Sequence, residues 1–158
     1  MTRKPNKHLL VVFHSQSGNT GRLIEAASRG AHNGDIDGVD VRTLTAVNAH
    51  SDDLLWADGL ILGTAENFGY MSGAIKDFLD RTYYEVEGKI QSLPYALIVS
   101  ANNDGTGAVR SIERIVGGYP FKSVQEPLIV VGDVSDKSLG EAEELGLLLA
   151  AGLESGIF

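Results

Sequence analysis

Apolar residues are concentrated in five short runs, which are separated by longer segments with helical spacing. The runs lie at residues 9–13, 39–44, 59–63, 96–100 and 128–131. Short runs in which Val, Ile and Leu are nearly continuous are typical of strands buried on both faces of a sheet. The pattern therefore predicts a sheet of five parallel strands.

The segments between these runs have the period of amphipathic helices. The clearest follows Thr20, where Leu23, Ile24, Ala27 and Ala31 fall on one face, and similar patterns follow residues 70, 107 and 137. A short helix is predicted over residues 51–56, with Ser51 as its N-cap. Alternating strands and helices predict a doubly wound α/β fold with helices on both faces of the sheet.

Three loops follow the predicted first, third and fourth strands and have unusual compositions. They comprise residues 15–20, 64–73 and 101–107. If the strand order is 2-1-3-4-5, these three strands are neighbours, and their loops converge at the carboxyl edge of the sheet. Ligands bind at that edge in open parallel sheets, so the pattern predicts a ligand site there.

Composition narrows the chemistry that this site can perform. The chain of 158 residues contains no cysteine, which excludes disulfides, a thiolate nucleophile and Cys-ligated metal clusters. Four scattered histidines show no metal-ligand spacing, so no metal site is expected. The length suits one domain, predicted over residues 8–158 after a basic tail at residues 1–7.

The net charge of -8 argues against a nucleic-acid partner, because phosphate contacts need a basic face. The apolar run behind the basic N-terminus is too short for a signal-peptide core or a membrane span. A cytoplasmic protein without membrane contact is therefore expected. Acids predominate after residue 132, either as a surface for a basic partner or as a solvated helix face: Asp133, Asp136, Glu141, Glu143, Glu144 and Glu154.

The first loop has the composition of a phosphate site that contains no cation. The sequence HSQSGNT follows the first strand directly and leads into the first helix. Free N–H groups and the helix dipole at such a helix start bind phosphate, and Ser15, Ser17, Asn19 and Thr20 could add donors. A helix start that is capped by Thr20 or Asn19, and in which Gly18 makes the turn, explains the same residues.

Known nucleotide motifs do not match this loop. A P-loop needs Gly-Lys-Ser/Thr, and a dinucleotide fold needs Gly-x-Gly-x-x-Gly after the first strand; neither occurs here. No aspartate ends the third strand, as a phosphoacceptor domain of similar size requires. A terminal monophosphate held by neutral donors fits the loop better.

The second loop suits a flat, amphipathic ring. Glycines at 63, 69 and 73 alternate with Phe68 and Tyr70, so the segment combines accessible backbone with aromatic faces. Together the loops favour a ligand with a phosphate at one end and a planar ring at the other.

These two loops resemble those of the flavodoxin-like proteins. Residues 15–20 (SQSGNT) are similar to the flavodoxin phosphate signature, and residues 64–73 resemble the ring-binding loop of flavodoxin-like NAD(P)H-dependent reductases, including the WrbA-like quinone reductases. The similarity continues through residues 76–81 (KDFLDR). It implies a three-layer α/β/α sandwich with strand order 2-1-3-4-5 and FMN as the cofactor.

The resemblance also implies which residues contact FMN. The phosphate residues would be Ser15, Gln16, Ser17, Gly18, Asn19 and Thr20. The residues along the flavin would be Thr64, Ala65, Glu66, Asn67, Phe68 and Gly69. The far side of the ring would be closed by Ser100, Ala101, Asn102, Asp104, Gly105 and Gly107, although an ordinary Asn-Asp-Gly turn explains the end of this loop equally well.

Some residues depart from the reductase pattern or lack a clear role. Ala65 stands where these reductases usually have proline, and Asn67 where many have arginine, which predicts a flavin edge that is held less rigidly or less positively. Glu66 and Asp104 could exchange a proton or hydrogen-bond the flavin, or could be solvated. His14 adjoins the first loop without an assigned role, and Trp56 is expected to serve packing.

The main functional hypothesis is an FMN-dependent oxidoreductase that passes electrons from NAD(P)H to a quinone or similar small acceptor. The flavin carries this chemistry, so no catalytic side chain is assigned. One alternative is an electron-transfer flavodoxin that shuttles electrons between redox proteins; another is a binding module whose flavin site has decayed. A homodimer is implied by the resemblance alone.

Overall fold

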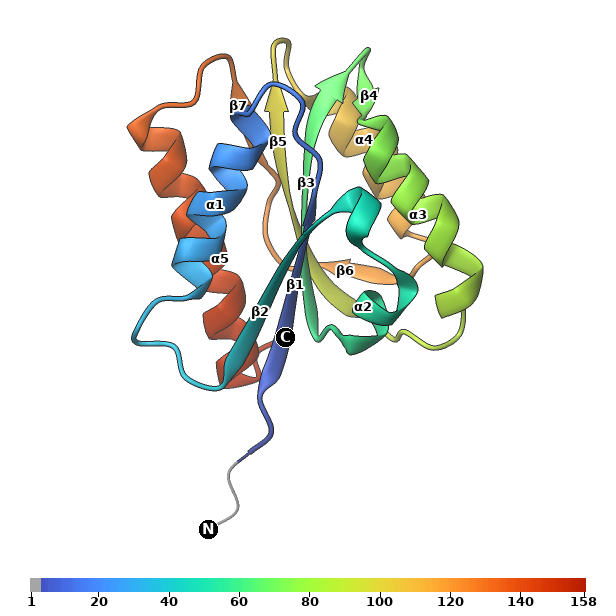
Figure 1. Cartoon of the computed structure of the whole chain (residues 1–158), viewed down its shortest axis with the longest axis vertical. Coiled ribbons are helices and arrows are strands. Elements are labelled where there is room, and N and C mark those ends of the chain that lie inside the picture. Colours follow the sequence, from blue (N-terminus) through green and yellow to red (C-terminus); the bar gives the residue numbers. More distant parts are fainter. Residues whose placement is uncertain (1–3) are drawn as a thin grey trace.

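A twisted parallel sheet forms the middle layer of the protein, and helices cover both of its faces (Figure 1). The computed structural model describes residues 4–158. The strands are β1 (Lys7–Phe13), β2 (Val39–Thr45), β3 (Gly59–Asn67), β4 (Tyr70–Met71), β5 (Leu93–Ala101), β6 (Phe121–Ser123) and β7 (Leu128–Val131). The helices are α1 (Asn19–Ala31), the 3-10 turn η1 (Ala46–Asn48), α2 (Ser51–Trp56), α3 (Gly73–Val86), α4 (Thr106–Val116) and α5 (Asp136–Ser155).

The predicted strand order is confirmed, with a divided fifth position. Strands run β2-β1-β3-β5, and both β6 and β7 pair in parallel with β5. Strand β6 pairs with the first residues of β5 and β7 with its last residues. Pro127, just before β7, has no N–H to donate, which disfavours one continuous edge strand.

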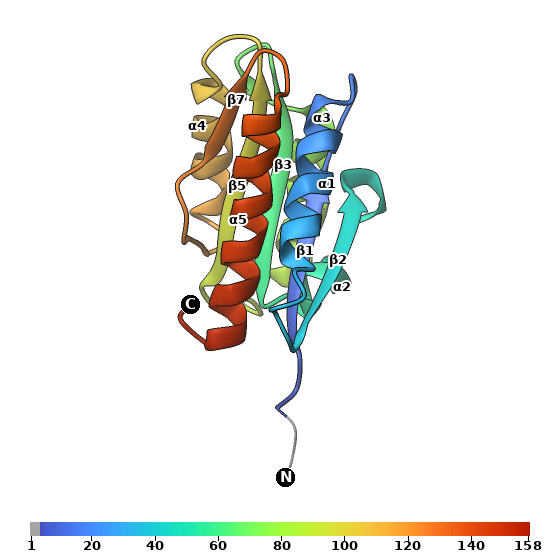
Figure 2. The same cartoon turned by 90° about the vertical axis from the view of Figure 1, so that its left-hand side faces the viewer.

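The core lies on both faces of the sheet, as expected for strands buried on two sides. Leu10 and Val12 belong to the cluster packed under α3 and α4, whereas Leu9 and Val11 belong to the cluster under α1 and α5. This alternation along β1 follows from the two-residue period of a strand. Figure 2 shows α1 and α5 along one face of the sheet.

Details at the start of the chain and of α2 differ from the expectations. The N-cap of α2 is His50 rather than Ser51, which already begins the helix, and the Asp53 carboxylate accepts the His50 N–H at 2.8 Å. Of the predicted tail, residues 1–3 lie outside the described part of the chain, and Lys7 begins β1. The division into tail and domain stays a prediction.

Trp56 serves packing, as predicted. Its ring stacks on the imidazole of His8, in β1, with ring centroids 4.2 Å apart. The guanidinium carbon of Arg42, in β2, lies 3.9 Å from the centroid of the Trp56 ring. Arg42 also pairs with Asp53 at 2.8 Å. The indole therefore joins α2 to the strands β1 and β2.

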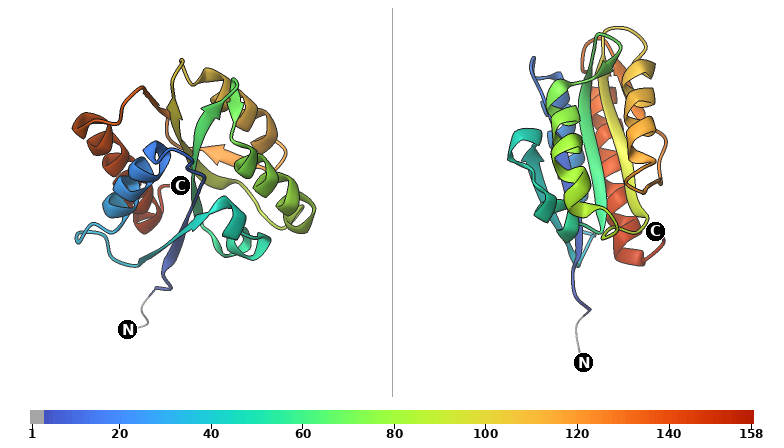
Figure 3. Two further views of the ribbon diagram at one scale, coloured as in Figure 1. Left: turned by 45° about the horizontal axis from the view of Figure 1, so that its top comes forward. Right: turned by 90° about the vertical axis from the view of Figure 1, so that its right-hand side faces the viewer.

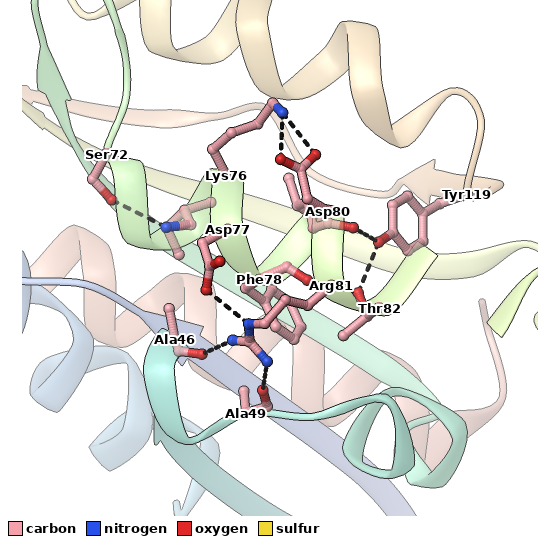
Figure 4. Close-up of polar contacts among 12 residues, drawn as sticks. Ala46, Ala49, Ser72, Lys76, Asp77, Phe78, Asp80, Arg81, Thr82 and Tyr119 are labelled. Carbon is pink, nitrogen blue, oxygen red and sulfur yellow. Dashed lines mark hydrogen bonds and ion pairs between the residues drawn. The ribbon is translucent and has the colours of Figure 1, made fainter. Parts of the chain in front are cut away.

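Arg81 fastens the connection between β2 and α2 to helix α3 (Figure 4). Its guanidinium donates to the carbonyl oxygens of Ala46 (2.9 Å) and Ala49 (3.2 Å) and to the Asp77 carboxylate (2.7 Å). Both carbonyls lie outside the strands, and the Ala46 oxygen also accepts the Ala49 N–H at 3.3 Å, so the arginine adds a second set of bonds that holds the turn η1 against α3.

A buried tyrosine hydroxyl ties the end of α4 to α3 (Figure 4). Tyr119 hydrogen-bonds the Thr82 hydroxyl at 2.8 Å and donates to the Leu79 carbonyl oxygen. Burial raises the pKa of Tyr119 to about 12, so the hydroxyl stays protonated and able to donate over the whole neutral range. Within residues 4–158, no helix is both long and apolar enough to cross a membrane.

Helices α1 and α5 approach each other closely because glycines occupy their contact. A Cβ at Gly146 would lie 1.8 Å from the carbonyl oxygen of Ala27, and one at Gly30 would lie 1.8 Å from that of Glu143. Gly140, six residues earlier in α5, faces open space. The contact therefore needs glycine at two positions on facing helices, but not at Gly140.

Gly146→Ala and Gly140→Ala should change stability in opposite directions. Gly146→Ala should lower the free energy of unfolding by about 1–3 kcal/mol, because the helices must separate to admit the methyl group. Gly140→Ala should raise it by about 0.5–1 kcal/mol through helix propensity. Urea denaturation of both variants measures the difference, and equal effects would contradict the proposed contact.

Candidate functional site

The loops after β1, β3 and β5 meet at one end of the sheet, as predicted (Figure 3). They enclose a cleft of about 190 Å³. The lining residues come from all three loops: Gln16, Ser17, Asn19, Thr20, Ala65, Glu66, Asn67, Ser100, Ala101 and Asn102. These were all predicted site residues. The remaining predicted residues lie around the cleft without lining it: Ser15, Gly18, Thr64, Phe68, Gly69, Asp104, Gly105 and Gly107.

A larger hollow, of about 620 Å³, lies elsewhere between α1 and β2. It is lined mainly by residues of α1, such as Ile24 and Arg29, with Phe13 and Thr43 from the strands. None of the residues from the second or third loop reaches it. The smaller cleft is the one at the carboxyl edge of the sheet, so the chemistry of the three loops belongs there.

The start of α1 leaves several hydrogen-bond donors unused. Its N-cap is Gly18, which has φ 101° and no side chain, and its first turn contains no acid. Within residues 4–158, no hydrogen bond involves the side chains of Gln16, Ser17, Asn19 or Thr20. This helix end therefore presents neutral donors and a positive dipole end to the cleft.

Ser15 has a different role from its neighbours. Its hydroxyl oxygen accepts the N–H of Gly21 at 3.0 Å, inside the first turn of α1. A side-chain oxygen that accepts from this turn is a helix cap. The capping interaction at this helix start thus comes from Ser15 and not from Asn19 or Thr20, and Gly18 is the N-cap. Gln16, Ser17, Asn19 and Thr20 line the cleft, and their contact with a phosphate stays a prediction.

Thr64 is a buried residue that holds the second loop by hydrogen bonds at its base. Its side chain is fully buried, and its hydroxyl accepts the Ser72 N–H at 2.9 Å and donates to the Ala65 carbonyl oxygen at 2.8 Å. Ser72 in turn caps α3. Thr64 therefore holds both ends of the loop together and does not face the cleft.

The second loop is a β-hairpin, which the sequence did not predict. Strand β4 pairs antiparallel with the end of β3, Asn67 opposite Tyr70. The two turn residues, Phe68 and Gly69, have φ values of 52° and 71°, as in type I′ hairpin turns. The Phe68 side chain is fully exposed at this tip and does not line the cleft, and its contact with the flavin stays a prediction.

The hairpin is bound to the start of α4 by contacts from both of its strands. An oxygen of the Glu66 carboxylate accepts the N–H groups of Gly107 (3.0 Å) and Ala108 (3.2 Å). From β4, the Met71 N–H donates to the Ser111 hydroxyl at 3.1 Å. A Cβ at Gly107 would lie 2.1 Å from the Gly69 carbonyl oxygen, so only glycine allows this approach.

The third loop is divided between the cleft and a helix start. Ser100, Ala101 and Asn102 line the cleft, whereas the Asp104 carboxylate accepts the backbone N–H (3.0 Å) and hydroxyl (2.8 Å) of Thr106. The hydrogen bond from the Thr106 hydroxyl lowers the pKa of Asp104. Gly105 is the N-cap of α4 with φ 75°. The predicted Asn-Asp-Gly turn is therefore real, and it follows the cleft residues.

His8 lies 4.0 Å from carboxylate oxygens of both Asp40 and Asp58. Within residues 4–158, no group of three or more His, Asp or Glu residues is arranged to hold a metal ion. His14 donates its backbone N–H to Gly63, and its Nδ1 is buried without a hydrogen-bond partner. It does not line the cleft.

Ser15→Ala and Ser17→Ala should separate the capping residue from the cleft residue. Loss of the Ser15 cap should lower the free energy of unfolding by about 1 kcal/mol. Ser17→Ala removes no hydrogen bond within the chain, so its effect should stay within about 0.5 kcal/mol. Chemical denaturation of the protein without added ligand measures both, and similar losses would contradict this division of roles.

Comparison with known proteins identifies similar sequences. The model of a family described as NADPH-dependent FMN reductase matches residues 9–132. A flavodoxin of Aquifex aeolicus is 35% identical over 86 residues, which are 52% of this chain and 45% of that protein. An NAD(P)H dehydrogenase (quinone) of Acidithiobacillus ferrooxidans is 39% identical over 92 residues, or 47% and 46% of the two chains. The matched region thus spans less than half of these curated relatives.

Solved structures agree on the fold. A flavodoxin from the domain Archaea superimposes with a TM-score of 0.81 at 24% sequence identity. The match covers 92% of this chain and 98% of that one. At this identity the likeness establishes a flavodoxin-like fold, which confirms the predicted fold class.

Proposed function

Because this chain belongs to the NADPH-dependent FMN reductase family, we propose that it binds FMN in the cleft and transfers electrons from NAD(P)H to a quinone or similar small acceptor. Family membership confirms the resemblance drawn from residues 15–20 and 64–81. The observation that carries the proposal is the start of α1, whose unused donors open into a cleft shared with two further loops.

The residues at the start of α1 fit the phosphate of FMN. Gln16, Ser17, Asn19 and Thr20 offer uncharged donors, and Gly18 lets the backbone approach closely. Neither lysine nor arginine lines the cleft. A monophosphate can be held in this way by N–H groups, hydroxyls and the helix dipole, without the cation that a triphosphate requires.

The other two loops fit the two sides of a flat ring. Ala65, Glu66 and Asn67 lie on one side of the cleft, and Ser100, Ala101 and Asn102 on the other. Thr64 and Gly107 do not line the cleft, but they position the loops that do: Thr64 bonds Ser72 at the base of the second loop, and Gly107 lets that loop approach α4. Bound FMN would accept a hydride and pass on one or two electrons, while the protein orients it and controls access.

A protein acid or base is not needed for this reaction. Glu66 is the ionisable side chain among the residues that line the cleft, and its carboxylate is already engaged by two backbone N–H groups. The chain therefore contributes binding and electrostatics, in agreement with the absence of an assigned catalytic side chain.

An electron-transfer flavodoxin is the second candidate. The flavodoxin of Aquifex aeolicus and the acidic residues after position 132 favour it. A redox titration distinguishes the two functions: two well-separated one-electron steps support a shuttle, and a single two-electron step supports the reductase. The homodimer and the cytoplasmic location stay predictions.

Anaerobic addition of NADPH, and separately NADH, to the FMN-loaded protein tests the main proposal. We expect the flavin absorption to bleach within the mixing time of the assay and to return when a quinone is added. An absorption spectrum that neither nucleotide changes would contradict the reductase function. The same experiment shows which of the two nucleotides is the better donor.

Ser17→Ala should weaken FMN binding without unfolding the protein. Removing one hydrogen bond to a phosphate costs about 1.5–3 kcal/mol, roughly a tenfold or greater rise in Kd. Fluorescence titration of the apoprotein with FMN measures this, and titration with riboflavin, which has no phosphate, is the control. Equal losses for both ligands would place Ser17 away from the phosphate.

A further inference from the structure

Glu66 both lines the cleft and hydrogen-bonds the start of α4, and no other described residue does both. It is the ionisable side chain among the residues that line the cleft, and it reaches across to another loop to bond the first turn of α4. Its partners, Gly107 and Ala108, are 41 and 42 positions away in sequence. One carboxylate therefore lies between the cleft and the positive end of a helix.

The start of α4 differs in this respect from the start of α1. Both N-caps are left-handed glycines without a side chain, Gly18 in α1 and Gly105 in α4. In α1 the first turn has no acid, and its cap is the neutral hydroxyl of Ser15. In α4 a carboxylate accepts two of the first N–H groups and offsets the positive dipole end.

This difference matters because only one end of the cofactor changes charge. In the function proposed above, hydride transfer adds two electrons and one proton to the ring, so the reduced ring carries one more negative charge, and NAD(P)⁺ leaves. The phosphate keeps its charge throughout. Glu66 lies on the wall assigned to the ring, where neither Lys nor Arg compensates it.

We propose that Glu66 lowers the reduction potential of the bound cofactor by disfavouring the negative charge of its reduced ring. The inference rests on the proposed FMN site. The carboxylate repels the added charge directly and also cancels the α4 dipole end that would otherwise stabilise it. A lower potential makes the reduced cofactor a stronger donor to the acceptor.

Asp104 does not share this role, although it stands at the same helix start. Its carboxylate is exposed, bonds Thr106 and does not line the cleft. Solvent therefore screens its charge from the ring. Glu66 is instead part of the cleft wall and is held there by the hydrogen bonds that fix its carboxylate.

Glu66→Gln tests the charge while keeping the hydrogen bonds. The amide oxygen can still accept from Gly107 and Ala108, so the hairpin should stay docked on α4. We expect Kd for reduced FMN to fall relative to Kd for oxidised FMN by about tenfold, which corresponds to a potential about 30 mV higher for the two-electron couple. Equilibration of the FMN-loaded protein with a reference dye measures this potential directly.

Two further variants separate charge from position. Glu87→Gln makes the same charge change at the C-cap of α3, outside the cleft. It should alter the Kd ratio, which is Kd for reduced FMN divided by Kd for oxidised FMN, by less than twofold. Glu66→Ala removes both charge and hydrogen bonds, so it should raise the potential and also lower the unfolding temperature. The Gln variant should leave the unfolding temperature nearly unchanged.

The inference is overturned if Glu66→Gln leaves the Kd ratio within twofold of the original protein. An equal rise in Kd for both oxidation states would also overturn it, because Glu66 would then only hold the hairpin. Bound FMN that no nicotinamide nucleotide reduces would contradict the reductase function, yet the dye equilibration would still measure the effect of Glu66. A protein that binds no FMN would remove both proposals.

Discussion

The N–H groups at the starts of α1 and α4 are the constraint around which the cleft is organised. Each helix begins with N–H groups that have no partner within the helix, and a glycine N-cap supplies none from its own side chain. The chain satisfies them differently. At α4, Glu66 accepts two of them, whereas α1 receives only the Ser15 hydroxyl and keeps its other donors for the cleft.

This arrangement depends on a sheet that brings distant loops together. Strands β1, β3 and β5 are neighbours, so the loops that follow them share one edge although their sequences are widely separated. The extension of β3 into a hairpin then carries Glu66 over to α4, and Gly107 permits the approach. The hydrogen bond between Thr64 and Ser72 closes the base of that hairpin, so the hairpin is held at its base as well as at α4.

The sequence pattern was sufficient for the strands β1, β2, β3, β5 and β7, for the main helices and for the place of the cleft, because these depend on periodicity and on general rules of parallel sheets. The hairpin escaped prediction because β4 has only two residues and its turn is Phe68-Gly69 rather than Asn-Gly. The partners of Glu66 escaped because hydrogen bonds across 41 residues leave no local signal. Likewise, Ser15 and Ser17 look equivalent in the loop, and only the backbone geometry assigns one to the helix and the other to the cleft.

The distribution of charge in the cleft follows a simple electrostatic logic. A phosphate keeps the same charge through a redox cycle, so a neutral set of donors can hold it equally well in both oxidation states. A ring that gains charge on reduction responds instead to whatever charge lies beside it. In the proposed complex, the uncharged side chains of Gln16, Ser17, Asn19 and Thr20 would face the phosphate, and the carboxylate of Glu66 would lie beside the ring. Binding strength and reducing power can thus be set by different loops, so that a substitution in one need not disturb the other.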